Sequence, residues 1–210
     1  MRKIIKNTWL KFLLPLRFKS GTSVAESVTP HPDAKPLDWN QKEAAKETYT
    51  SGREYFIFAG TIHSRHRLLV LLKAFSEFKK WQQSEMMLII AGSTSKWTAE
   101  LKDKLLTYKY RQDVQLLENP SPEVLLRLIA CAYALVYLDE QDAFPVDILN
   151  ALQSRIPVIA DHTPSIEKAM AGRGILTAPG NHQELAAHLV RLYKDESFRT
   201  ALIEKSSKRP

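Results

Sequence analysis

Short apolar runs alternate with longer amphipathic segments from Glu54 to the end of the chain. The run Tyr55–Ala59 (YFIFA) is continuously apolar and is closed by Gly60. The segment LLVLLKAFSEFKKW that follows has apolar residues at intervals of three and four. The first pattern predicts a strand buried on both faces, and the second predicts an amphipathic helix.

The same unit of strand and helix then repeats along the chain. Further strands are expected at MMLIIAG, DVQLLE, ALVYLDE, PVIAD and GILTAPG, and helices around 98–108, from 121, and around 146–153, 165–170, 183–193 and 196–205. Strands that are apolar on both faces need helices on both sides of the sheet. The pattern therefore predicts an α/β fold, a doubly wound, Rossmann-like parallel sheet of about six strands.

This pattern divides the chain into three parts. Residues 53–210 form the predicted Rossmann-like domain. Residues 20–52 combine prolines, small polar residues and charges with few apolar anchors, and are expected to be a connector with one short helix around 41–49. Residues 1–19 form a basic amphipathic segment.

The amino-terminal segment has apolar residues at helical spacing, which predicts a short basic helix over residues 2–14. Such a face is suited either to peripheral contact with an anionic membrane or to packing on protein, and both interpretations stay open. Lys11 interrupts the apolar region, and no small-residue cleavage site follows, so a signal peptide is not expected. No apolar run approaches the roughly 20 residues of a membrane span. A cytoplasmic location is expected, with membrane association through residues 2–14 as the open alternative.

Charge and composition narrow the classes of function. The net charge is +7, from 30 Lys and Arg against 23 Asp and Glu, but six of the bases precede the first acid, Glu26. The rest of the chain is nearly neutral, so nucleic acid is not an expected partner. Cys131 is the single cysteine, and no group of His or Cys has the spacing of a metal site. No metal is therefore expected.

In open parallel sheets, ligands bind at loops that leave the carboxyl ends of the strands. One such loop, Gly60–Arg67 (GTIHSRHR), combines a glycine, a helix start and the charges of Arg65, His66 and Arg67. These features suit a diphosphate, because free N–H groups and positive charge converge there. The alternative is a solvated basic helix start. The chain has neither G-x-G-x-x-G nor G-x-x-x-x-G-K-[ST], which argues against dinucleotide oxidoreductases and P-loop hydrolases.

Three stretches together resemble the carboxyl-terminal, donor-binding domain of retaining GT-B glycosyltransferases, the group that includes sucrose synthases and bacterial mannosyltransferases. They are YFIFAGTIHSRHRLLVLLKAFSEF, MMLIIAGS, and the block from ENPSPEV to PVIAD, within about residues 53–206. The resemblance implies one half of a GT-B fold and a UDP- or GDP-sugar as donor. VTPHPDAKPLDW is weakly similar to the region between the two domains of such enzymes, which suggests a truncated two-domain protein.

The resemblance also implies roles for individual residues. The family's Glu, seven residues, Glu motif falls on Asp142, which would orient the sugar, and Asn150, which would bind the ribose. Phe144 matches a phenylalanine that glycines flank in the family, with Ala143 and Pro145 replacing those glycines here. Both motif positions depart from glutamate, which weakens the expected contacts, since a charge-assisted hydrogen bond is about twice as strong as a neutral one.

The phosphate loop shows similar departures. Gly60 would allow the backbone to approach the diphosphate, and Arg65 matches a basic position of the family. His66 replaces a lysine, and Thr61 stands where many members have arginine. Arg65, helped by His66 and the helix N–H groups, would stabilise charge on the leaving diphosphate, so neither a metal nor a further cofactor is implied.

The residues of the acidic loop and Asn150 also have purely structural interpretations. Asp142 would serve as a helix N-terminal cap, and Asn150 would face solvent. Asp139, Glu140 and Asp147 are expected to be solvated. For Asp142 and Asn150, both the donor-site roles and these structural roles stay open.

Two functions follow. The first is a glycosyltransferase that transfers a glycosyl group from a nucleotide sugar and needs a partner chain for the acceptor domain, because about 50 amino-terminal residues cannot form one. The alternative is a catalytically inactive module of the same fold that acts in binding or as a scaffold.

Overall fold

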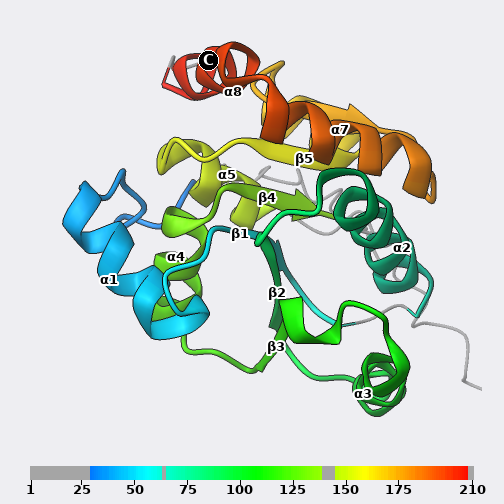
Figure 1. The fold of residues 1–210 in the computed structure, drawn as a ribbon. Helices are drawn as coiled ribbons and strands as arrows, with labels where there is room; N and C mark the ends of the chain where they lie inside the picture. Colours follow the sequence, from blue (N-terminus) through cyan, green and yellow to red (C-terminus); the bar gives the residue numbers. More distant parts are fainter. Residues whose placement is uncertain (1–28, 63–64, 139–144, 208–210) are drawn as a thin grey trace, which may run out of the picture.

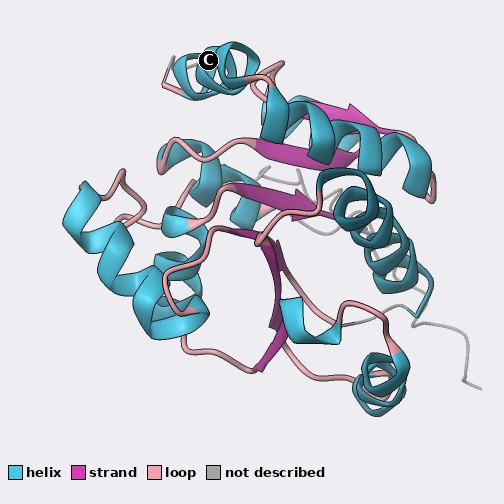
Figure 2. Cartoon of the chain, in the orientation of Figure 1, coloured by secondary structure: helices cyan, strands magenta, loops and turns pink. Residues whose placement is uncertain are grey.

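A computed structural model describes residues 29–62, 65–138 and 145–207 of the chain. Six parallel strands form one sheet in the order β3-β2-β1-β4-β5-β6. They are β1 (Tyr55–Ala59), β2 (Met87–Gly92), β3 (Val114–Glu118), β4 (Ala134–Tyr137), β5 (Val158–Asp161) and β6 (Ile175–Thr177). Helices cover both faces of this sheet (Figure 2). The predicted doubly wound α/β fold is confirmed.

The helices occupy two layers. They are α1 (Trp39–Thr50), α2 (Arg65–Gln82), α3 (Thr98–Thr107), α4 (Pro122–Cys131), α5 (Val146–Gln153), α6 (Pro164–Met170), α7 (His182–Lys194) and α8 (Glu196–Ser206), with a 3-10 turn η1 (Arg111–Asp113) before β3. Helices α2 and α7 pack together on one face, while α1, α4 and α5 lie on the other (Figure 1). The helix predicted in the connector is α1, which is longer than expected at both ends.

Strand β1 forms the centre of the core, because its alternate side chains enter opposite layers. Phe56 and Phe58 pack with the α2 and α7 side, and Tyr55 and Ile57 pack with the α4 and α5 side. All four side chains are buried. Burying each contributes about 1.5 to 3 kcal/mol. The continuous apolar run thus reflects burial on both faces.

Strand β3 differs from the other strands in being only partly buried. It lies at the edge of the sheet, where it pairs with β2 alone. Its Gln115 and Glu118 are consistent with this position, because polar and charged side chains are tolerated on an edge strand. The prediction of a strand at DVQLLE is confirmed, whereas full burial of that strand is wrong.

An ion-pair junction stands at the amino ends of the strands, opposite the ligand edge. The Asp113 carboxylate lies 2.9 Å from the Arg53 guanidinium and 3.0 Å from Lys79 Nζ. Lys79 also donates to the carbonyl oxygens of Ser84 and Met86. This junction joins the beginning of β3 to the end of α2, at the edge of the sheet opposite the loops that follow the strands.

Candidate functional site

The strand order reverses between β1 and β4, which are neighbours in the sheet although two strands separate them in the sequence. At such a reversal the connections leave for opposite faces, and ligands bind in the crevice between them. The loop after β1 leads to α2, and the segment after β4 leads to α5. The starts of α2 and α5 therefore border the expected ligand edge.

Two glycines bring the loops after β1 and β2 into contact at this edge. A Cβ atom built on Gly92 would lie 1.6 Å from the Gly60 carbonyl oxygen, and Gly60 itself has a φ of +142°. The Gly60 amide donates to the Ala91 carbonyl (3.2 Å), and the Ile62 amide donates to the Ser93 carbonyl (3.0 Å). Both positions thus require glycine, Gly60 for its backbone conformation and Gly92 for the close approach.

The predicted phosphate loop leads into the amino end of α2. Arg65 is the first residue of this 18-residue helix, and His66 follows in its first turn. The first N–H groups of a helix have no partner within it, and the helix dipole makes this end positive. The backbone at Arg65 and His66 therefore has the polarity expected of an anion site, while their side chains lie outside the described part. Thr61, which precedes α2 in the loop after β1, is half-buried.

Arg67 is held by an acid from a different strand. Its guanidinium Nη1 lies 2.9 Å from the Asp161 carboxylate, whose side chain is 1% exposed against 15% for Arg67. Asp161 is the last residue of β5, at the carboxyl edge of the sheet. The pair therefore ties the first turn of α2 to the end of β5.

This pairing changes the interpretation of Arg67. Sequence reasoning grouped Arg67 with the charges available to a diphosphate, but its charge is balanced by Asp161. The signal for the pair was an acid at the end of the otherwise apolar run PVIAD. An ionised carboxylate is rarely buried without a cation beside it, so Asp161 required a basic partner that spacing alone does not identify.

Asn150 is buried, with 7% of its surface exposed. Its Oδ1 accepts a hydrogen bond from the His31 backbone N–H at 2.7 Å. The alternative in which Asn150 faces solvent is therefore wrong. The side chain holds the connector against α5, a contact between residues 119 positions apart, and its role toward a ribose stays a prediction.

A hollow of about 400 Å³ opens beside Asn150. We call it the α4–α5 hollow, because side chains along α4, from Pro122 to Ile129, and at the start of α5 line it together with connector residues Thr29 to Pro32. Its volume lies in the range of small-molecule sites, about 300 to 1,000 Å³. Since both helices begin at the carboxyl edge of the sheet, the hollow starts at the ligand edge and extends along α4 as far as Ile129.

Asp147 lines the same hollow and is half-buried. Removal from water raises the pKa of its carboxyl above the usual range of an aspartate. Asp147 is therefore less solvated than expected. Sequence reasoning missed this residue because Asp147 follows an acidic loop and, read along the chain, looks like one more surface charge.

The remaining residues predicted for the donor site cannot be placed in it. Asp142 and Phe144 lie outside the described residues, as do Asp139 and Glu140. The N-cap position of α5 is occupied by Pro145.

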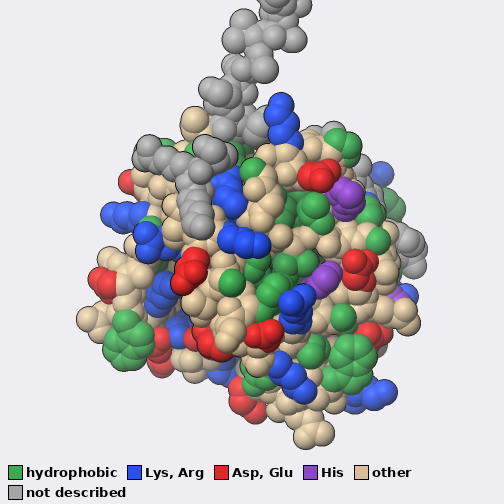
Figure 3. Space-filling model, turned by 90° about the horizontal axis from the view of Figure 1, so that it is seen from above, with side chains coloured by type: hydrophobic (Ala, Val, Ile, Leu, Met, Phe, Trp, Pro, Cys, Tyr) green, Lys and Arg blue, Asp and Glu red, His purple; other side chains and the backbone are tan. Residues whose placement is uncertain are grey.

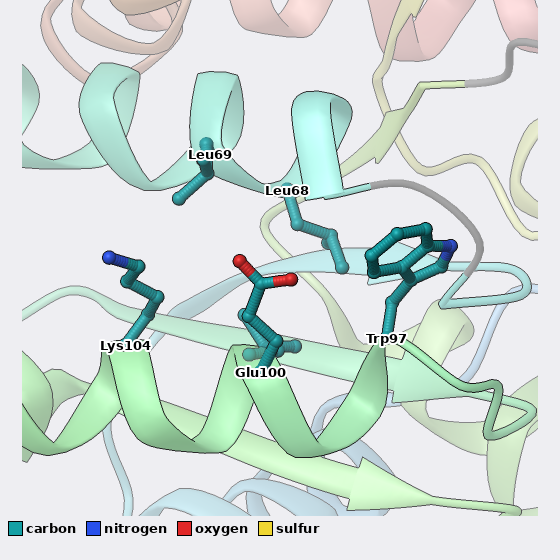
Figure 4. A pocket seen from close by; sticks show the side chains of 6 residues that line it. Leu68, Leu69, Trp97, Glu100 and Lys104 are labelled. Carbon is teal, nitrogen blue, oxygen red and sulfur yellow. The ribbon is translucent and has the colours of Figure 1, made fainter.

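A separate apolar crevice lies between α2 and α3, where the Trp97 ring stands beside Leu68 and Glu100 points toward α2 (Figure 4). Its volume is about 10 Å³. That is about the space of one water molecule, which excludes a sugar or nucleotide in this conformation.

Surface charge agrees with the near-neutral composition of the body. On the face seen in Figure 3, described basic and acidic side chains are interspersed. Among the described residues, no group of three or more His, Cys, Asp or Glu side chains is arranged to hold a metal ion. Over the same residues, no helix is long and apolar enough to cross a membrane.

A family model described as "Glycosyl transferases group 1" matches residues 40–209. The chain belongs to this family. The chain is 24% identical over 146 residues to the O-antigen chain mannosyltransferase B of Escherichia coli. The match covers 69% of this chain and 38% of the mannosyltransferase. The chain thus spans well under half the length of this curated relative.

Solved structures share the fold. WaaG, a glycosyltransferase involved in lipopolysaccharide biosynthesis, superposes with a TM-score of 0.73 at 17% identity, over 85% of this chain and 49% of WaaG. HepE of Anabaena, solved in complex with UDP and glucose, superposes with a TM-score of 0.67 at 16% identity, over 82% of this chain and 48% of HepE. At these identities the likeness shows the fold, and each structure is matched over about half its length. The architecture of this family member is one half of a GT-B fold.

Proposed function

We propose that this chain is the donor-binding half of a glycosyltransferase, which takes up a UDP- or GDP-linked sugar and transfers the glycosyl group to an acceptor. The observation that carries the proposal is that the start of α2 and the buried Asn150 border the same reversal of strand order. Membership of the glycosyl transferase family and the UDP and glucose bound to HepE support it.

The chemical task is to stabilise the leaving group. The bond between the anomeric carbon and the diphosphate oxygen breaks, and negative charge gathers on the nucleoside diphosphate. Positive groups already in place at that position stabilise the transition state without reorganisation. In this proposal, Arg65 and the N–H groups at the start of α2 take that role, His66 assists, and Gly60 lets the backbone approach.

Asn150 would bind the ribose through its amide nitrogen. Its Oδ1 is engaged by the His31 N–H, so the NH₂ group is the part of the side chain left to donate to a ribose hydroxyl. A neutral donor is weaker than the charged acceptor of the family's glutamate. We therefore expect modest nucleotide affinity. Asp142 would orient the sugar.

The acceptor side would come from a second domain or chain. A GT-B active site closes between two domains, and closure excludes water and completes the catalytic geometry. The described residues form one such domain. Sugar transfer is therefore expected only where a partner supplies the other half.

Thermal unfolding with and without UDP, GDP and a sugar-linked form of each tests the donor site. A ligand present at 100 times its dissociation constant stabilises the fold by about 2.7 kcal/mol. Arg65→Ala should reduce the stabilisation by nucleoside diphosphates. Lys73→Ala removes an exposed charge from the same helix and should not. No stabilisation of the unaltered protein at millimolar nucleotide would contradict the proposal and favour an inactive scaffold.

A further inference from the structure

The walls of the α4–α5 hollow are largely apolar. They are formed by Pro30, Pro32, Pro122, Leu125, Ile129 and Val146. Burial of a planar ring against such walls is favourable because it removes apolar surface from water. Asn150 and Asp147 supply side-chain polarity within the same hollow.

Asp147 differs from the other residues that line the hollow because it brings a carboxylate into it. Within the described residues, no ion pair or hydrogen bond to its side chain is found, and burial alone raises its pKa. Removing a carboxylate from water is costly unless N–H or O–H donors replace the lost hydration. A ligand that brings such donors into the hollow would supply them.

We propose that the α4–α5 hollow receives the nucleobase of the donor and that Asp147 selects guanine over uracil, so that the donor is a GDP-sugar. This inference rests on the proposed function, because it starts from a ribose at Asn150. Residues three apart on a helix lie on the same side. Asp147 and Asn150 therefore face one ligand together, and a ribose held by Asn150 has its base directed into the space that Asp147 lines.

The hydrogen-bonding edges of the bases explain the choice. Guanine carries two N–H donors side by side, at N1 and the 2-amino group, and a carboxylate accepts two parallel hydrogen bonds. Uracil presents a single N–H between two carbonyl oxygens, which a carboxylate repels. Adenine pairs its amino donor with an acceptor nitrogen. Of these three bases, only guanine can donate one hydrogen bond to each oxygen of a carboxylate.

Calorimetric titration of the full chain with GDP, UDP and ADP tests the inference. We expect GDP to bind at least about tenfold more tightly than UDP or ADP, because hydrogen bonds to charged groups contribute most to discrimination. Asp147→Asn should weaken GDP binding by about tenfold to a hundredfold, and should leave UDP binding unchanged or stronger. Asp103→Asn, the same change at an exposed acid of α3, should alter neither.

A second variant tests the hollow independently of charge. Leu125→Trp would fill the space between α4 and α5, and it should abolish GDP binding while the protein retains its melting transition. Equal affinities for GDP and UDP in the unaltered protein, or GDP binding unaffected by both variants, would overturn the assignment of the base to this hollow. Failure of all three nucleotides to bind would overturn the proposed function itself, which distinguishes the two failures.

Discussion

The Arg67 guanidinium lies 2.9 Å from the Asp161 carboxylate and joins the first turn of α2 to the end of β5. The carboxylate is almost fully buried. Removing one partner of a buried ion pair leaves the other charge uncompensated, which costs about 3 to 5 kcal/mol. The pair therefore matters for stability as well as for the position of the helix start.

Replacement of either partner should destabilise the fold strongly. We expect Asp161→Ala and Arg67→Ala each to lower the free energy of unfolding by about 3 kcal/mol, measured by urea denaturation. The double variant should lose less than the sum, because each single variant already removes the same ion pair. Lys102→Ala, which removes an exposed partner of Glu118, should cost at most about 1 kcal/mol. Strict additivity would contradict the interaction.

Gly92 tolerates no side chain. Its Cβ position lies 1.6 Å from the Gly60 carbonyl oxygen, so Gly92→Ala must displace the loop after β1. We expect a loss of about 1 to 3 kcal/mol in unfolding free energy and weaker nucleotide binding. Gly180→Ala, where φ is +79° but nothing lies within 4 Å of the added carbon, should cost only about 1 kcal/mol and leave binding intact. Unchanged nucleotide affinity in Gly92→Ala would contradict the role of the loop.

Asp147 should make stability depend on pH. Its pKa is raised in the folded state above the ordinary 3.8, so the folded protein binds more protons than the unfolded chain as pH rises from that value. Stability is therefore lost with rising pH. We expect Asp147→Asn to be more stable than the unaltered protein at pH 7, with the difference vanishing toward pH 3.8.

Denaturation curves of both proteins at several pH values give this comparison. His31 lines the same hollow, so His31→Gln serves as a second background in which the effect of Asp147→Asn should persist. A variant that is less stable at every pH would show that the carboxylate is favourably bonded.

Cys131 should be unreactive in the native protein. The side chain is buried, and burial raises the pKa of its thiol to about 11. The thiolate is the reactive form, and at pH 8 only about a thousandth of such a thiol is ionised. We expect slow modification by a thiol reagent in buffer and rapid modification in concentrated urea. Rapid native labelling would show that α4 opens locally.

Residues 2–14 lie outside the described residues, and their membrane contact stays a prediction. We expect the full chain to co-sediment with vesicles that contain anionic lipid and a chain beginning at Ser20 to remain in solution. Binding should weaken as salt increases, because basic side chains provide the attraction. Equal sedimentation of both chains would assign the contact to another surface.

The fold was largely predictable because its local patterns agree with its global arrangement. Continuous runs such as Tyr55–Ala59 occur where a strand is buried on both faces, and the helix predicted around 196–205 matches Glu196–Ser206 closely. Prediction failed at β3, where an edge position leaves a strand partly exposed. Periodicity does not reveal which strand will be an edge.

The site was less predictable, because its decisive contacts join residues far apart in the sequence. The sequence pattern alone did not indicate that Asn150 accepts from His31 or that Arg67 pairs with Asp161. The first contact shows that Asn150 is not a solvent-facing residue, and the second shows that the charge of Arg67 is balanced within the protein. Burial of Asn150 and Asp147 also depends on how the connector crosses α5, which is a tertiary property.

The hydrogen bond between the His31 backbone and Asn150 fixes where the polypeptide enters the domain. Thr29, the first described residue, lines the α4–α5 hollow, and two residues later the chain is fastened to α5. A displacement of Thr29–Pro32 would therefore reshape one wall of that hollow. The bond from the His31 N–H to Asn150 thus helps to set the width of the hollow, because it holds this wall of the connector against α5.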